Sequence, residues 1–140
     1  AKVTLREFGD PNSSSVGRLI VHHSTVSDWT QLDWVKEEYA LGVDTGQMAV
    51  SDKDTFQNPS IVPENQKFTF GDNRDEPAIA EAMWYSYCCE LTLGSAGGVF
   101  EGGAVSNAGW GDGGYSGYHA LNKRGELIGF RVEFIDEDGN

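Results

Sequence analysis

Residues 94–117 of the chain read GSAGGVFEGGAVSNAGWGDGGYSG. This stretch holds ten of the 18 glycines, between short apolar pieces such as Val99-Phe100 and Ala104-Val105. Glycine destabilises an ordinary strand interior by about 0.5–1 kcal/mol, so such density predicts tight turns, bulges and close approaches between backbones. We expect a mostly extended architecture around this stretch.

The segment after it predicts a β-hairpin. Two strand-like runs, Tyr115–Leu121 and Leu127–Ile135, flank the polar residues 122–126. Gly125 suits the left-handed position of the turn that joins them.

Further strands are expected on either side of an ambiguous segment. Val3–Phe8 and Arg18–Val26 show strand patterns, and Leu41–Val50 alternates around glycines as one strand. Ser27–Ala40 fits a helix capped by Asp28 or an extended aromatic ribbon equally well.

One helix is expected near residues 75–88. Asp75 is a suitable N-cap, Pro77 fits the first turn, and apolar residues recur at helical spacing in Ile79, Met83, Trp84 and Tyr87. The alternation in Glu90–Leu93 predicts a strand directly after this helix. Three polar or proline-containing segments predict loops, namely Asp10–Ser15, Gln57–Gln66 and Gly71–Asp75.

These elements predict a β-rich α+β fold, with antiparallel sheets in a sandwich or a curled, barrel-like arrangement under one helix. The 140 residues, 39% of them hydrophobic, predict a single domain over 1–140.

The net charge of the chain limits the classes of partner that it can bind. Ten Lys and Arg against 22 Asp and Glu give a formal net charge of -12, which repels nucleic-acid phosphates and anionic lipid. No apolar run approaches the roughly 20 residues of a membrane span, and residues 1–5 do not resemble a signal peptide. We expect a cytoplasmic protein that binds neither nucleic acid nor membrane.

The two cysteines, Cys88 and Cys89, are adjacent in the sequence. Neighbouring cysteines rarely form a disulfide, and no C-x-x-C spacing is present, so reduced thiols with at least one buried as a small hydrophobe are expected. The sequence predicts no cofactor and no metal ligand set.

The strongest candidate for a site is the glycine-aromatic loop. One interpretation is a structural turn whose aromatics fill the core, and the other is a ligand-binding loop that presents Asp112 and backbone amides. The candidate ligand-binding residues are Asp44, Gly46, Trp110, Gly111, Asp112, Gly113, Tyr115 and His119. No catalytic residue is assigned.

Histidines and carboxylates offer two alternatives. His22, His23 or His119 could pair with Asp112 or Asp44 beside the glycine-rich loop, as in a hydrolase-like enzyme. A set of carboxylates, Asp44, Asp52 and Asp54, could hold calcium, although the calcium-loop pattern is absent and a solvated acidic face is the simpler interpretation.

Two motifs together resemble a known family. Residues 43–52 (VDTGQMAVSD) and residues 103–115 (GAVSNAGWGDGGY), in this order with Trp84-Tyr85 between them, resemble the mainly bacterial and phage family called domain of unknown function 4241. The resemblance covers about two-thirds of the chain, from near Gly17 to Phe134, and departs from the family pattern at Gly114 and at Ser116–Tyr118. It implies a shared fold and no established activity.

The resemblance also suggests that the Asp44 strand and the Asp112 loop adjoin. In that case Asp44 would be a buried carboxylate that accepts hydrogen bonds from loop amides, and its loss would cost about 1–3 kcal/mol. For function, we expect a small non-enzymatic binding or interaction module that takes a protein partner with a basic surface, with a homodimer as a further possibility. The alternatives are the His/Asp enzyme and a calcium or small-ligand module.

Overall fold

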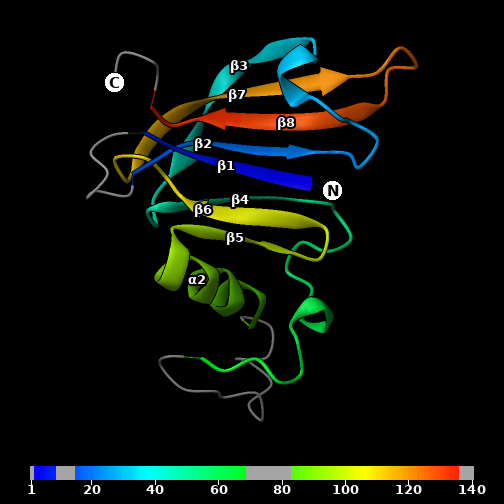
Figure 1. Ribbon diagram of the computed structural model, residues 1–140. Helices are drawn as coiled ribbons and strands as arrows, with labels where there is room; N and C mark the ends of the chain where they lie inside the picture. The colour runs from blue at the N-terminus through cyan, green and yellow to red at the C-terminus, as the bar shows by residue number, and fades with distance from the viewer. Residues whose placement is uncertain (1, 9–14, 69–82, 136–140) are drawn as a thin grey trace.

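The computed structural model describes residues 2–8, 15–68 and 83–135. Within these ranges the chain forms two antiparallel sheets and one α-helix, arranged as layers (Figure 1). The larger sheet has the order β1 (Lys2–Phe8), β2 (Ser15–His22), β8 (Leu127–Glu133), β7 (Gly113–Leu121) and β3 (Trp34–Val43). The smaller sheet has the order β4 (Gln47–Ser51), β6 (Gly103–Asn107) and β5 (Gly97–Phe100). The predicted β-rich α+β fold is confirmed, and the sheets do not close into a barrel.

The predicted hairpin is formed by β7 and β8. Gly125 has φ 78° in its turn. The Asn122 side chain accepts hydrogen bonds from the backbone N–H groups of Arg124 and Glu126, at 2.9 and 3.0 Å. Local turn chemistry therefore fixes the register of two long strands.

The single strand expected over Leu41–Val50 is wrong. β3 ends at Val43 in the larger sheet, and β4 begins at Gln47 in the smaller sheet. Gly46 turns the chain between the sheets with φ 71°, a conformation that residues with a side chain rarely adopt. The glycines inside an alternating pattern mark a change of sheet here.

The ambiguous segment Ser27–Ala40 is extended, apart from the 3₁₀ turn η1 (Trp29–Gln31), which Asp28 caps. Trp29 and Trp34 lie against arginines of the larger sheet. The Arg18 guanidinium is 5.8 Å from the Trp29 ring centroid, and the Arg131 guanidinium is 4.9 Å from that of Trp34 and 4.3 Å from that of Tyr118. Nε of Arg131 also forms a 3.0 Å ion pair with Glu133. The cation–π contacts explain why the aromatic residues favour a ribbon against the sheet.

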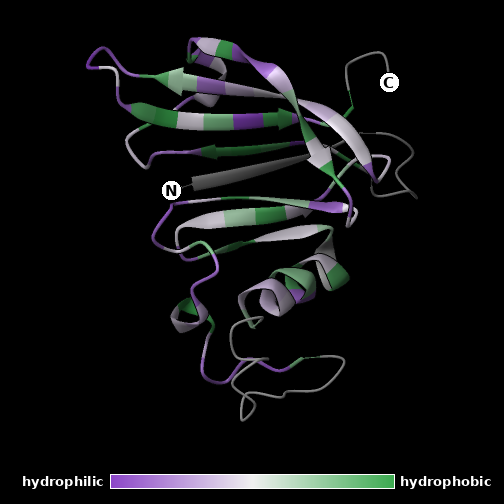
Figure 2. Ribbon diagram, turned by 180° about the vertical axis from the view of Figure 1, so that it is seen from behind, coloured by the Kyte–Doolittle hydropathy of each residue, from purple (hydrophilic) through white to green (hydrophobic). Residues whose placement is uncertain are grey.

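The main core lies between the two sheets. Apolar side chains of β2, β8 and β3 face those of β4 and β6, as the green stretches of the facing strands indicate (Figure 2). The buried members of this cluster are Val16, Leu19, Val43, Ala104, Ala108, Val132, Phe134 and Ile135.

A second core lies between the smaller sheet and α2 (Met83–Ser95). Trp84 packs edge-on against Phe56 and Phe100, with ring centroids 5.2 and 5.5 Å apart. Leu91 contacts the same cluster. Trp84, Cys88 and Leu91 share one helical face because they are four and three residues apart.

The strand expected over Glu90–Leu93 is therefore wrong, since these residues continue α2 as far as Ser95. Two leucines alternating over four residues do not distinguish a strand from the last turns of a helix. The beginning of the predicted helix, residues 75–82, lies outside the described residues, as do the loops predicted over Gly71–Asp75 and most of Asp10–Ser15.

Two further expectations concern the end of β2 and the segment Gln57–Gln66. β2 ends at His22 instead of Val26, and the chain turns there with a 3.0 Å hydrogen bond from Val26 N to His23 O. Gln57–Gln66 forms no strand but contains the 3₁₀ turn η2 (Pro59–Ile61), with Pro59 at its start. In the described part of the chain, no helix is long and apolar enough to cross a membrane.

Candidate functional site

The glycine-aromatic loop joins β6 to β7 and is bound to the turn at Asp44–Gly46. The Gly46 N–H donates to Oδ1 of Asp112 at 2.8 Å. The Ala108 N–H donates to the Gly46 carbonyl at 2.9 Å. The turn after β3 and the loop before β7 thus adjoin, as expected.

The Tyr115 side chain fixes the same loop through its hydroxyl group and its ring. Its hydroxyl lies 2.6 Å from the Gly111 carbonyl oxygen and 3.2 Å from that of Ala108. Its ring packs at right angles on Phe134, with centroids 5.0 Å apart. Both oxygens are carbonyls, so the hydroxyl donates to them, and the loop is closed on itself by its own aromatic residue.

The role expected for Asp44 is wrong. Its side chain is exposed, and the carboxylate that accepts the connecting hydrogen bond is that of Asp112. The direction of the hydrogen bond is the reverse of the expected one. The backbone N–H comes from Gly46, which turns it toward the loop, and the accepting carboxylate belongs to the loop. Asp44, Trp110 and Asp112 form what we call the acidic loop surface, in which Trp110 is 64% exposed and both carboxylates face solvent.

His119 lies apart from this surface. It is six residues beyond Gly113 along β7, in register with Phe130, and its Nδ1 is 2.7 Å from Oε1 of Glu37. The structure therefore brings together seven of the eight candidate ligand-binding residues and separates His119 from them.

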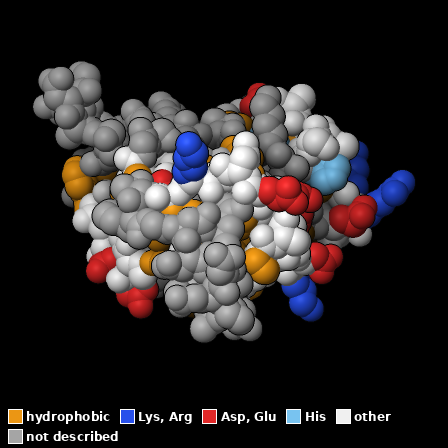
Figure 3. Space-filling view, turned by 90° about the horizontal axis from the view of Figure 1, so that it is seen from below, with side chains coloured by type: hydrophobic (Ala, Val, Ile, Leu, Met, Phe, Trp, Pro, Cys, Tyr) orange, Lys and Arg blue, Asp and Glu red, His pale blue; other side chains and the backbone are white. Residues whose placement is uncertain are grey.

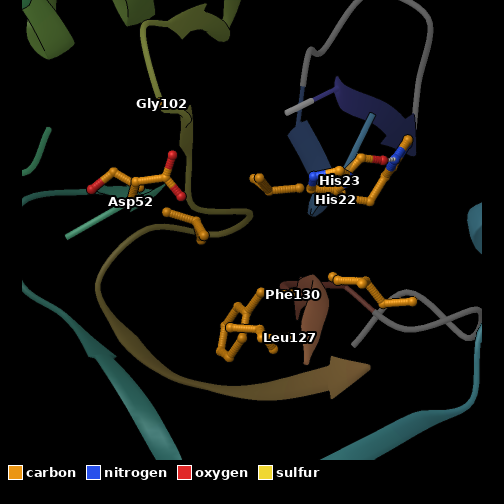
Figure 4. Close-up of a pocket in the computed structure, with 11 residues that line it drawn as sticks. His22, His23, Asp52, Gly102, Leu127 and Phe130 are labelled. Atoms are coloured by element: carbon orange, nitrogen blue, oxygen red, sulfur yellow. Dashed lines mark hydrogen bonds between the residues drawn. The ribbon is translucent and has the colours of Figure 1, made fainter. Parts of the chain in front are cut away.

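A pocket of about 280 Å³ opens between the sheets at their other end. Asp52 and Gly102 lie on one side of it, the two histidines at the end of β2 lie opposite, and Phe130 and Leu127 lie along β8 (Figure 4). Val21, Val50 and Ile128 complete much of its apolar wall. Residues of both sheets line the pocket.

Hydrogen bonds assign opposite tautomers to the two neutral histidines. Nδ1 of His22 lies 3.0 Å from the His23 carbonyl oxygen, which only accepts, so Nδ1 carries the proton. Nδ1 of His23 accepts from the Thr25 N–H at 3.2 Å, so its proton is on Nε2. His22 is 4% exposed, whereas His23 is exposed.

The pocket and the acidic loop surface lie at opposite ends of β4 and β6. In that pair, Gln47 is in register with Asn107 near the loop, and Ser51 with Gly103 near the pocket. Four residue steps separate the ends, or about 13 Å. Among the described residues, no hydrogen bond joins a histidine to Asp44 or Asp112, so the expected His/Asp pair is not assembled.

Asp44, Asp52 and Asp54 are each exposed. Within the described ranges, no group of three or more His, Cys, Asp or Glu side chains is placed to hold a metal ion. On the face seen in Figure 3 the carboxylates are spread around the molecule instead of gathered in one place. This arrangement agrees with the interpretation of a solvated acidic face.

Both cysteines are free, and Cys88 is buried as expected. Burial, together with the neighbouring Cys89, raises the pKa of the Cys88 thiol to about 12. Sγ of Cys89 lies 3.2 Å from Nε2 of Gln47, whose Oε1 accepts from the Thr92 hydroxyl at 3.2 Å. These contacts connect α2 to β4.

Sequence reasoning did not find the pocket. The pattern around Asp52 indicates only a set of neighbouring carboxylates, and no motif marks Val50, Gly102 or Phe130 as site residues. Each looks like an ordinary strand or turn residue, and no motif connects positions that lie up to about 80 residues apart.

No family model, curated protein or solved structure matches the chain. The family resemblance of the two motifs stays a prediction.

Proposed function

We propose that this protein is a small interaction module that binds a protein partner with a basic surface through the acidic loop surface. The observation that carries the proposal is Trp110, which is 64% exposed on a loop held by hydrogen bonds at both ends. A tryptophan held in solvent by a rigid loop offers a large contact area with little loss of conformational entropy on binding.

The charge around Trp110 favours a cationic partner. Asp112 is exposed two residues further along the same loop, Asp44 is exposed on the turn that is hydrogen-bonded to Asp112, and the whole chain carries a formal net charge of -12. Such a field accelerates association with a basic surface and makes the association rate sensitive to salt.

The test starts with capture at low ionic strength, followed by titration of the identified partner as a pure protein. We expect Trp110→Ala to weaken binding at least tenfold, as for an aromatic hot spot. Asp44→Asn should weaken it a few-fold and reduce its salt dependence. The matched control is Tyr39→Ala, because Tyr39 is 68% exposed but lies on β3.

Two outcomes would contradict the proposal. One is the failure to capture any basic protein at low salt. The other is equal affinity for the wild type and Trp110→Ala, or an equal loss with Tyr39→Ala, which would remove the specific role of this surface.

A further inference from the structure

We propose that the pocket between the ends of β2, β4 and β8 is a separate site for a small organic ammonium ion, a primary amine on a compact apolar body. It is formed by other residues than the acidic loop surface and lies at the opposite end of β4 and β6.

The size and the apolar wall of the pocket determine how large and how apolar the body of the ligand can be. About 280 Å³ is close to the lower end of the roughly 300–1,000 Å³ typical of small-molecule sites, so one ring or a short branched chain fits. Val21, Val50 and Phe130 pack against the core between the sheets and line the pocket from fixed positions. They provide an apolar surface that needs no rearrangement.

The Asp52 carboxylate favours a ligand with a positive charge. The Asp52 backbone is held by the 2.8 Å hydrogen bond from its N–H to the Gly102 carbonyl and by N–H groups of Thr55 and Phe56 that donate to its own carbonyl. The carboxylate itself has no partner among the described residues. Among the described residues, the lining contains no Lys or Arg, so an ammonium group would be the first ionic partner of this carboxylate.

His22, on the opposite side of the pocket from Asp52, adds a hydrogen-bond acceptor (Figure 4). Its Nδ1–H is used by the His23 carbonyl, which leaves Nε2 of the neutral ring able to accept an N–H from a ligand. Among the described lining residues an anion finds no fixed cation, and it meets the repulsion of the net charge of -12. The polar groups therefore favour an ammonium ion over a carboxylate or phosphate.

The probe is phenethylamine, titrated into the full chain and followed by NMR. We expect saturable binding with a Kd near or below about 1 mM, with shifts at the imidazole signals of His22 and His23 and none at the Trp110 indole N–H. The neutral isostere 2-phenylethanol should bind more weakly, and phenylacetate should not bind.

Asp52→Asn should weaken phenethylamine about fivefold while leaving 2-phenylethanol unchanged, because only the ionic contact is removed. Asp54→Asn is the matched control: Asp54 is equally exposed two residues away but does not line the pocket, so its loss should leave binding unchanged. Leu127→Ala should weaken the amine and the alcohol alike.

The inference is overturned if phenethylamine does not saturate the histidine shifts, if the alcohol binds as tightly as the amine, or if Asp52→Asn and Asp54→Asn have the same effect. Trp110→Ala separates this inference from the proposed function. It should weaken binding of the basic partner at least tenfold and leave amine binding intact, so either proposal can fail alone.

Discussion

Single residues take their roles from where the fold places them. Asp44 and Asp112 are both aspartates in glycine-rich surroundings, but only Asp112 accepts the Gly46 N–H that connects the two motifs. Cys88 and Cys89 are neighbours in sequence, but Cys88 is buried, which raises the pKa of its thiol, whereas Cys89 is half-buried. Residue type alone does not distinguish the members of either pair, because the difference comes from which backbone or solvent each side chain meets.

Cys88 makes stability fall at alkaline pH. Its folded pKa of about 12 lies above the ordinary thiol value of 9.0, so the unfolded state loses the thiol proton first. The contribution is fully present below about pH 9 and is lost progressively as the pH rises toward 12. We expect Cys88→Ala to lose less thermal stability than the wild type between about pH 8 and pH 10.5, measured by circular dichroism. Equal losses in the two proteins would contradict this role for Cys88.

Among the elements, the contact between β4 and β6 explains part of the glycine density. A Cβ at Gly103 would lie against the Val50 carbonyl oxygen and 2.7 Å from Cα of Ser51. The expected close approach between backbones is therefore confirmed at this position. Gly42 on β3 has open space around its Cβ position and needs no such explanation.

Gly103→Ala should destabilise the protein by about 1–3 kcal/mol, because backbone atoms of β4 must move to admit the methyl group. Gly42→Ala should be neutral or stabilising by up to about 1 kcal/mol, since it only restricts the unfolded chain. Urea unfolding of both variants measures the two free energies. If Gly103→Ala is as stable as Gly42→Ala, close packing is not the reason for glycine at position 103.

At the scale of the whole molecule, two apolar layers stabilise a chain with a large negative charge. The core between the sheets and the core under α2 are both apolar, whereas the whole chain carries a formal net charge of -12. Self-repulsion among these charges opposes the compact state.

Salt should therefore stabilise the protein. Raising NaCl from about 10 mM to about 150 mM shortens the Debye length from roughly 30 Å to about 8 Å, which screens the repulsion among surface carboxylates. We expect Tm to rise over this range and then to level off. A Tm that falls with added NaCl would mean that attractive ion pairs, such as Arg18–Glu133, outweigh the repulsion.

The sequence by itself determined the features that depend only on residues close to one another along the chain. The β7–β8 hairpin, the first strand and the β-rich class follow from alternation, turn residues and glycine content within short windows. The same local rules went wrong at Leu41–Val50 and Glu90–Leu93, where a change of sheet and the end of a helix both look like strand alternation.

Only the tertiary structure decided the rest. It placed the Asp44 turn against the Asp112 loop, moved His119 away from both, and formed a pocket from Asp52, His22 and Phe130. These arrangements depend on which strands pair and which faces stack. They arise from the burial of apolar side chains distant in sequence, a property that no local pattern contains.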